Sequence, residues 1–222
     1  MQRIGIFGGT FDPVHVGHLV AALWCRDELA LDNVLLVVAN EPWQKVATRD
    51  LSSAEDRFAV VAAAVEGVER LEASRIEIDR GGPSYTADTV EQVSGEFPGA
   101  ALYLVVGTDV AAELGTWQRI EEVSSLVTLV VVDRTLPQDN SARGPGRSEG
   151  RGSEGRGSEL LARRETVEWR WPGAVERVRM PMLEVSSSEL RDHIQRGRSV
   201  EFLIPEPAIR LIERLGLYSV GG

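Results

Sequence analysis

The sequence is most constrained near its start, where a short apolar run and a glycine pair lead into a helical pattern. Residues 4–7 predict a strand, residues 8–9 are both glycine, and residues 19–25 predict a helix. Glycines let the backbone approach an anion closely, and a helix N-terminus supplies free N–H groups and the positive end of the helix dipole. His15 and His18 are three residues apart at the helix start, so both face one side. The segment therefore predicts a phosphate site.

Strand-like and helical segments alternate along the rest of the chain. Continuous apolar runs are typical of strands that are buried on both faces of a parallel sheet. They occupy residues 34–38, 101–106 and 126–132. Residues 71–79, with Ile76 and Ile78 on one side, predict a further strand by alternation, and residues 175–182 predict a last one. The pattern predicts an α/β fold, a doubly wound and largely parallel Rossmann-like sheet with helices on both faces.

Several helices carry start and stop signals in the sequence. Ser52 and Glu55 have the spacing of a capping box, which places Ser52 at the N-cap of a helix. Serines at residues 186–188 stand between a strand and a helix, where serine is a favoured cap. Pro205 begins the last amphipathic helix and Gly216 ends it.

The length of 222 residues allows one sizeable core and is too short for two comfortable ones. We therefore expect a single domain over residues 1–222. Residues 137–158 lack apolar periodicity and contain repeated Gly-Arg-Gly-Ser-Glu units, which predicts a flexible surface insertion. A nucleic-acid-binding arginine–glycine tract is the alternative, but glutamates cancel most of its charge and no aromatic residues interleave.

Charge and cysteine content narrow the classes of partner. The formal net charge of −10 argues against nucleic acid, because long polyanions bind basic surfaces, whereas a small phosphorylated substrate needs only local donors. No apolar run approaches the roughly 18 residues of a membrane span, and no signal peptide is expected. The lone Cys25 cannot form an internal disulfide, so we expect a packed thiol and a cytoplasmic protein. The sequence does not decide whether the protein forms a homo-oligomer.

Polar clusters follow five of the expected strands. They lie at residues 8–18, 40–45, 84–88, 107–109 and 186–191. Because ligands of open α/β sheets bind at the carboxyl ends of the strands, these clusters are expected to converge on one polar and anionic ligand.

Two of these clusters resemble the motifs of one enzyme superfamily. The stretch GGTFDPVHVGH at residues 8–18 closely matches the G-G-[ST]-F-D-P-x-H-x-G-H signature of the nucleotidylyltransferases. Its H-x-G-H is shared in form with class I aminoacyl-tRNA synthetases. The stretch SSSELR at residues 186–191 resembles the superfamily's phosphate-binding element I-S-S-[ST]-x-[IL]-R.

Further motifs resemble bacterial nicotinate-nucleotide adenylyltransferases. Gly107 and Asp109, followed by Leu114 and Trp117, match G-x-D-x-x-x-x-L-x-x-W. Residues 84–89 match [SP]-Y-T-x-D-T, and the tail at residues 202–207 is also similar. Two segments depart from the family: Thr135-Leu136 follow Arg134 where the family has Pro-Gly, and residues 40–45 end in Trp-Gln-Lys where most members have a Pro-Pro-His-[KR] ending.

The resemblance implies transfer of the adenylyl group of ATP to nicotinate mononucleotide, which gives nicotinate adenine dinucleotide and pyrophosphate in NAD biosynthesis. His15 and His18 would be the catalytic donors to the triphosphate. The implied ATP-binding residues are Gly8, Gly9, Thr10, Phe11, Gly107, Asp109, Ser186, Ser187, Ser188 and Arg191. The implied mononucleotide-binding residues are Lys45, Tyr85, Thr86, Trp117 and Arg134. Mg²⁺ would be held mainly by phosphates and water, with no protein ligands.

Other readings remain open from the sequence. Within the superfamily the acceptor could be nicotinamide mononucleotide or phosphopantetheine. From another class, a non-catalytic nucleotide-binding regulator could keep the fold, but the intact His15, His18, Lys45 and Arg191 argue against it. A synthetase fragment is disfavoured because no tRNA-binding extension is present.

Overall fold

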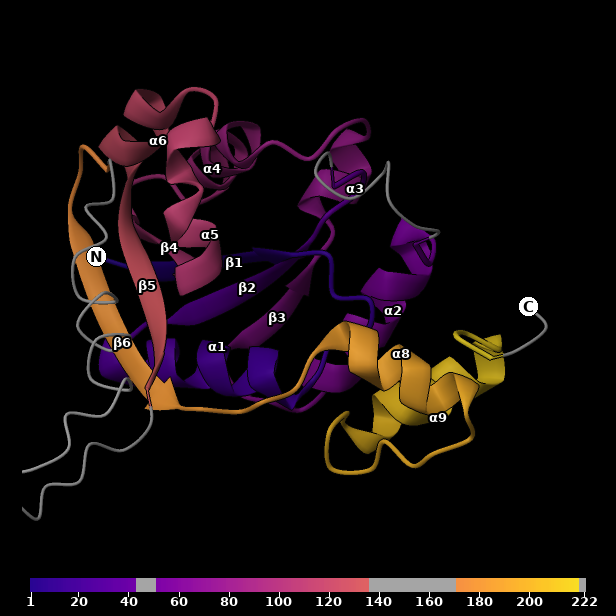
Figure 1. Cartoon of the computed structure of the whole chain (residues 1–222). Coiled ribbons are helices and arrows are strands. Elements are labelled where there is room, and N and C mark those ends of the chain that lie inside the picture. The colour runs from indigo at the N-terminus through magenta and orange to yellow at the C-terminus, as the bar shows by residue number, and fades with distance from the viewer. Residues whose placement is uncertain (43–50, 136–170, 220–222) are drawn as a thin grey trace, which may run out of the picture.

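The computed structural model describes residues 1–42, 51–135 and 171–219. Within these ranges the backbone forms a six-stranded sheet in the order β3-β2-β1-β4-β5-β6, and every neighbouring pair is parallel (Figure 1). The order reverses between β1 and β4, which makes the sheet doubly wound. The expected α/β fold is confirmed.

The strands are β1 (Arg3–Gly9), β2 (Asn33–Val38), β3 (Leu71–Ser74), β4 (Ala101–Gly107), β5 (Val127–Thr135) and β6 (Val175–Pro181). The central strands β2 and β4 are buried along almost their whole length, whereas the edge strands β3 and β6 are partly exposed. In β2, Val34 and Leu36 belong to one hydrophobic core, while Leu35 and Val37 belong to the other. Alternate residues of a strand point to opposite faces, so a continuous apolar run serves both cores.

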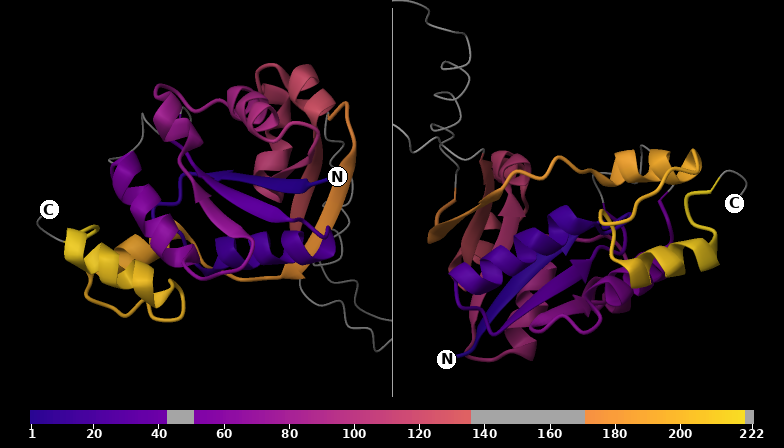
Figure 2. Two further views of the ribbon diagram at one scale, coloured as in Figure 1. Left: turned by 180° about the vertical axis from the view of Figure 1, so that it is seen from behind. Right: turned by 90° about the horizontal axis from the view of Figure 1, so that it is seen from below.

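Helices cover each face of the sheet (Figures 1 and 2). One core holds α1 (Val16–Glu28), α2 (Ala54–Val65), α8 (Ser187–Gln195) and α9 (Glu206–Leu215). The other holds α3 (Ile76–Arg80), α4 (Thr86–Glu96), α5 (Thr108–Ala112), the 3-10 helix η1 (Leu114–Thr116) and α6 (Ile120–Leu126). Cys25 on α1 is fully buried, as expected, and burial raises the pKa of its thiol to about 12. No helix in the described ranges has the length and apolar character to cross a membrane.

The expected strand over residues 71–79 is wrong beyond Ser74. There β3 reaches the end of its pairing with β2, opposite Val37, and the chain turns into the short helix α3. An ion pair between Arg75 and Asp79, 2.7 Å apart, spans one helical turn there. Ile76 packs into one core and Ile78 packs against the other. The two-residue spacing therefore resembles a strand, although each isoleucine contacts a different core.

The predicted cap of α2 is displaced by one residue. Ser53, not Ser52, is the N-cap, and its hydroxyl oxygen accepts the backbone N–H of Asp56 at 3.0 Å. The two adjacent serines each have an acidic residue three positions on, so the capping-box pattern fits both. The carbonyl of Ser52 instead accepts a hydrogen bond from Arg57.

The C-terminal helices return to the start of the chain. Ser186 caps α8 by accepting the backbone N–H of Glu189, and Gly216 ends α9 in the left-handed region at φ 65°, both as predicted. The N–H of Val16, the first residue of α1, donates to the carbonyl of Leu203 at 2.8 Å. This contact brings the segment between α8 and α9 against the loop that follows β1 (Figure 2).

Candidate active site

The loop after β1 lies at the reversal point of the sheet, where parallel sheets bind ligands. Its shape depends on Gly9, because a Cβ there would lie 2.7 Å from the ring of Phe11. That ring is buried at 2% exposure, and the backbone of Phe11 is left-handed at φ 49°. The Phe11 ring therefore packs against Gly9 inside the loop. Because the ring is buried, only the backbone of Phe11 can contact a nucleotide.

The two histidines form a stacked pair at the start of α1. Their ring centroids are 3.8 Å apart with an interplanar angle of 28°, and the Phe11 ring lies nearly perpendicular to that of His18 with centroids 5.0 Å apart. The backbone N–H of His15 donates to Nδ1 of His18 at 3.3 Å. Because Nδ1 accepts, the proton of neutral His18 resides on Nε2, which is then a donor. Gly17 leaves room for this pair, since a Cβ there would lie 3.1 Å from the ring of His15.

The late serine motif meets the first motif in space. The hydroxyl of Ser187 donates to the carbonyl of Pro13 at 2.9 Å, and Nη1 of Arg191 donates to the carbonyl of Asp12 at 2.5 Å. The other guanidinium nitrogen of Arg191 donates to the hydroxyl of Ser188 at 3.1 Å. Two segments more than 170 residues apart in the sequence therefore form one edge of the site, as their polar character predicted.

Asp12 is a buried anchor for the C-terminal part of the chain. Its carboxylate accepts the hydroxyl of Tyr218 at 2.8 Å and lies 3.9 Å from Nη1 of Arg191. Burial, and next the Asp12 charge, raise the pKa of the Tyr218 phenol, so this group is a neutral donor across the physiological range. The Asp12 side chain therefore binds residues near the C-terminus.

Replacing Tyr218 by phenylalanine is expected to lower the free energy of unfolding by about 1–3 kcal/mol, because a buried carboxylate loses a donor. Urea denaturation measures the change. Tyr103→Phe is the control, since the Tyr103 hydroxyl makes no hydrogen bond within the described residues and its ring is buried in the core against which Tyr218 packs. Equal stability of Tyr218→Phe and the wild type would show that the anchor contributes nothing.

Two further polar segments lie side by side across the site. The backbone N–H of Asn40, after β2, donates to the Ser84 hydroxyl at 2.8 Å. The N–H of Ser84 donates back to the carbonyl of Glu41 at 3.0 Å. The expected convergence of the 40–45 and 84–88 clusters therefore holds for their described residues.

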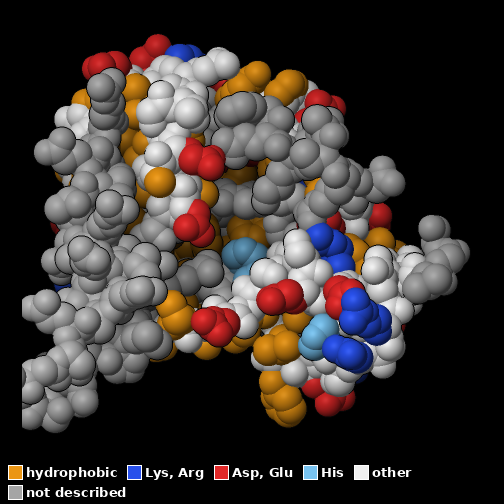
Figure 3. All heavy atoms as spheres, viewed as in Figure 1, with side chains coloured by type: hydrophobic (Ala, Val, Ile, Leu, Met, Phe, Trp, Pro, Cys, Tyr) orange, Lys and Arg blue, Asp and Glu red, His pale blue; other side chains and the backbone are white. Residues whose placement is uncertain are grey.

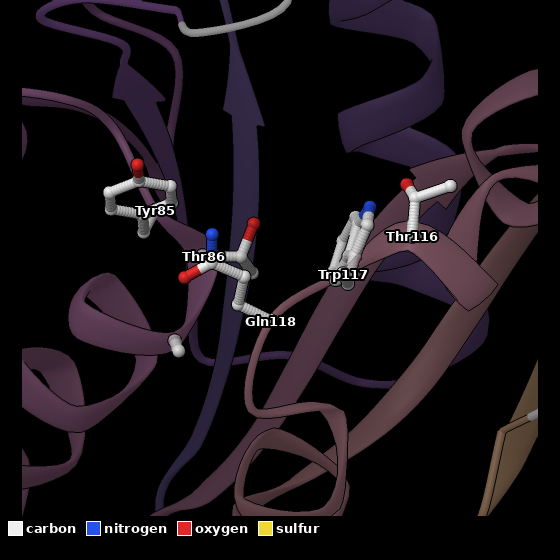
Figure 4. Close-up of a pocket in the computed structure, with 6 residues that line it drawn as sticks. Tyr85, Thr86, Thr116, Trp117 and Gln118 are labelled. Carbon is white, nitrogen blue, oxygen red and sulfur yellow. The ribbon is translucent and has the colours of Figure 1, made fainter.

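Aromatic and small polar residues form a cleft beside this pair of segments. Tyr85, Thr86 and Trp117 line a pocket of about 50 Å³, in which the two rings lie on opposite sides (Figure 4). Thr86 and Trp117 also line a larger cavity of about 210 Å³ together with residues 8–10 of the glycine loop. The residues assigned to the two substrates thus border one continuous region. Figure 3 shows a hollow in this face, with a histidine side chain at its floor.

The structure describes some of the remaining expected site residues and leaves others outside the described ranges. Gly107 is the N-cap of α5, and Asp109 is exposed in its first turn. Lys45 and the 137–158 insertion lie outside the described residues, as does the side chain of Arg134. Within the described ranges no cluster of three acidic, histidine or cysteine residues forms that could hold a metal ion.

Sequence reasoning missed two buried polar groups at this site. Glu77, on α3, borders the larger cavity and accepts the hydroxyl of Thr89 at 2.5 Å. Arg57, on α2, is 2% exposed and donates to backbone carbonyls on several loops. The burial of Arg57 could have been predicted from the sequence, because Val60, Val61 and Ala64 follow it at the spacing of one buried helix face.

Comparison with known proteins agrees with this geometry. A family model described as cytidylyltransferase-like matches residues 6–193. A probable nicotinate-nucleotide adenylyltransferase of Corynebacterium kroppenstedtii is 36% identical over 220 residues, which cover 99% of this chain and 92% of the relative. A protein of the same name from Gemmatimonas aurantiaca is 36% identical over 218 residues, covering 98% and 92%.

A solved structure supports the fold independently. The nicotinic acid mononucleotide adenylyltransferase of Plasmodium falciparum, complexed with NaAD, matches with a TM-score of 0.69 at 15% identity and covers 98% of each chain. The family match and the full-length relatives together identify the family of this chain. The chain belongs to the cytidylyltransferase-like family and, within it, to the nicotinate-nucleotide adenylyltransferases.

Proposed function

We propose that the protein transfers the adenylyl group of ATP to nicotinate mononucleotide, releasing pyrophosphate and forming nicotinate adenine dinucleotide. The observation that carries the proposal is the junction of the histidine loop with the Ser186–Arg191 motif, beside the Tyr85–Trp117 cleft. An oxygen of the mononucleotide phosphate attacks the α-phosphorus in line. The O–P bond to pyrophosphate breaks, and pyrophosphate carries away the electron pair.

The triphosphate is assigned to the first motif and to α8. His15 and His18 donate to the α- and β-phosphates, His18 from the Nε2 proton that its Nδ1 contact requires. Backbone N–H groups of Gly9 and Thr10 face the same phosphates at the N-terminus of α1. Ser187, Ser188 and Arg191 hold the leaving phosphates, together with the cap residue Ser186. Such fixed donors stabilise charge that develops in the transition state.

No general base is needed for this transfer, because the attacking phosphate is already ionised at neutral pH. Mg²⁺ enters as part of the MgATP substrate and is bound by phosphate oxygens and water. The described residues near the loop fit that assignment, since they offer imidazoles, hydroxyls and N–H donors and form no cluster of three carboxylates. Asp109 is assigned a hydrogen bond to a ribose hydroxyl of ATP.

The acceptor is assigned to the cleft between α4 and η1. The ring of Trp117 stacks on the pyridine, and Tyr85, Thr86 and nearby N–H groups receive its carboxylate. From their sequence positions alone, Lys45 is proposed to bind the mononucleotide phosphate, and Arg134 is proposed to bind the mononucleotide. The net charge of −10 and the single buried cysteine further support a cytoplasmic protein without a nucleic-acid partner.

The choice of acceptor is tested by measuring kcat/KM for three candidates, nicotinate mononucleotide, nicotinamide mononucleotide and phosphopantetheine, with MgATP and a pyrophosphate assay. We expect strong preference for the acid, because an amide turns its own N–H₂ toward N–H donors. Release of pyrophosphate with the amide alone would overturn the acceptor assignment. Binding of ATP without turnover of any acceptor would favour the regulator instead.

Replacing Trp117 by alanine is expected to raise KM for nicotinate mononucleotide about 10-fold, because stacking on an aromatic ring contributes about 1–3 kcal/mol. KM for ATP should stay within about twofold, since the ring is assigned to the acceptor alone. Steady-state kinetics with each substrate varied in turn measures both constants. Trp24→Ala is the control, because Trp24 is an exposed residue of α1. An unchanged KM for the mononucleotide would remove Trp117 from the acceptor site.

A further inference from the structure

The guanidinium of Arg57 lies beneath the loop that follows β1. Its Nη1 donates to the carbonyl of Thr10 at 2.9 Å and to the carbonyl of Ala39 at 2.7 Å. Arg57 is 2% exposed, and it is among the largest fully buried side chains in the described ranges. A charged side chain is buried at this depth only when many acceptors compensate for its lost hydration.

The same side chain reaches two further segments. Its Nη2 donates to the carbonyl of Asn40 at 3.0 Å, and its Nε donates to the carbonyl of Ser52 at 3.0 Å. Asn40 follows β2 and donates its backbone N–H to Ser84, next to Tyr85 of the acceptor cleft, and Ser52 precedes the N-cap of α2. Arg57 therefore connects the glycine loop, the backbone after β2 and the residue before the N-cap of α2.

The geometry of arginine makes this a rigid connection. A guanidinium is planar and presents its donors in a fixed fork, so the distances between its acceptors are set by one group. A lysine would place a single point charge there and could not reach the carbonyls on both sides with the same geometry. A methionine would leave all four carbonyls without this donor.

We propose that Arg57 is a positioning residue that sets the separation between the ATP loop and Asn40, whose contact with Ser84 lies beside the acceptor cleft. This inference rests on the proposed function, since in-line attack requires the α-phosphorus and the mononucleotide phosphate to be held at one distance. The guanidinium of Arg57 donates to four backbone carbonyls. It acts through the Thr10 loop on one side and the Asn40 segment on the other.

The test compares Arg57→Met with Val60→Ala, a core variant on the same helix. Val60 is fully buried in the core that α2 shares with α1, α8 and α9, so its truncation lowers stability without removing a contact to a loop. We expect kcat/KM for Arg57→Met to fall about 100-fold, the scale of an ångström-level misplacement of reacting groups. Val60→Ala should keep kcat and both KM values within about twofold below its melting temperature.

A second readout separates positioning from general loosening. In the wild type, a non-hydrolysable ATP analogue is expected to tighten binding of nicotinate mononucleotide, because one side chain orders both loops. This coupling should disappear in Arg57→Met and persist in Val60→Ala. Added guanidinium ion should restore part of the turnover of Arg57→Ala, whose cavity matches that ion. If Arg57→Met does not fold, Arg57→Lys is compared by the same measurements.

The outcomes are distinct from those that test the proposed function. A wild-type protein without turnover would fail the proposed function itself. An active wild type with an Arg57 variant of unchanged kcat/KM and coupling would overturn the positioning role. A Val60→Ala variant with the same loss of turnover and coupling would also overturn it, because any destabilisation of α2 would then suffice.

Discussion

Replacing His18 by alanine is expected to lower kcat by about 100-fold, the effect of removing one donor to charge that develops in the transition state. KM for ATP should change little, because the contact strengthens as the leaving phosphate gains charge. Nδ1 of His18 already accepts the N–H of His15, so Nε2 of neutral His18 carries the proton that we propose is donated to the ligand. Single-turnover kinetics with MgATP and nicotinate mononucleotide measures the chemical step directly.

His18→Gln is the informative companion variant. A glutamine amide places an N–H₂ group near the position of Nε2, so it should recover part of the turnover that alanine loses. Circular dichroism and the binding constant for ATP show whether the loop is intact in both variants. Turnover of His18→Ala at the wild-type rate would exclude this imidazole from the mechanism.

Replacing Arg191 by methionine is expected to lower kcat/KM by about 100-fold, because the leaving phosphates lose a charged donor. The variant should also lose about 1.5–3 kcal/mol of unfolding free energy, since Arg191 donates to the carbonyl of Asp12 and faces its buried carboxylate. Pyrophosphate release and urea denaturation measure the two effects on the same preparation.

Arg196→Met is the matched control on the same helix. Arg196 pairs with Asp192 at 2.8 Å, but its side chain is 59% exposed, and such surface pairs contribute at most about 1 kcal/mol. Its catalytic constants should equal those of the wild type. If both variants lost activity equally, the loss would reflect net charge or the stability of α8, and the specific role of Arg191 would be wrong.

The regular parts of the fold follow from local patterns in the sequence. Runs such as Val34–Val38 within β2 are apolar at every position because both faces of the strand are covered. Helix ends at Ser186 and Gly216 were predictable because their signals are local. The strand predicted through Ile76 and Ile78 failed because two cores on opposite faces can each take one residue of a short helix.

The functional site was predictable in its motifs but not in its connections. The histidine loop and the serine motif carry recognisable residue types, and parallel topology brings them to one edge. The contacts of Asp12 with Tyr218 and of Arg57 with Thr10 join residues distant in sequence. Their partners include backbone carbonyls, which have no residue signature. Only the fold reveals such contacts.

The most direct measurement follows the α-phosphorus of ATP through one reaction. ATP labelled at the α-phosphate is incubated with Mg²⁺, nicotinate mononucleotide and the protein, and the products are separated by mass and identified. We expect the label in nicotinate adenine dinucleotide, unlabelled pyrophosphate in equal amount, and about 100-fold slower formation of both products by His18→Ala. Label recovered only in ATP or free AMP, with no dinucleotide formed, would contradict adenylyl transfer to this acceptor.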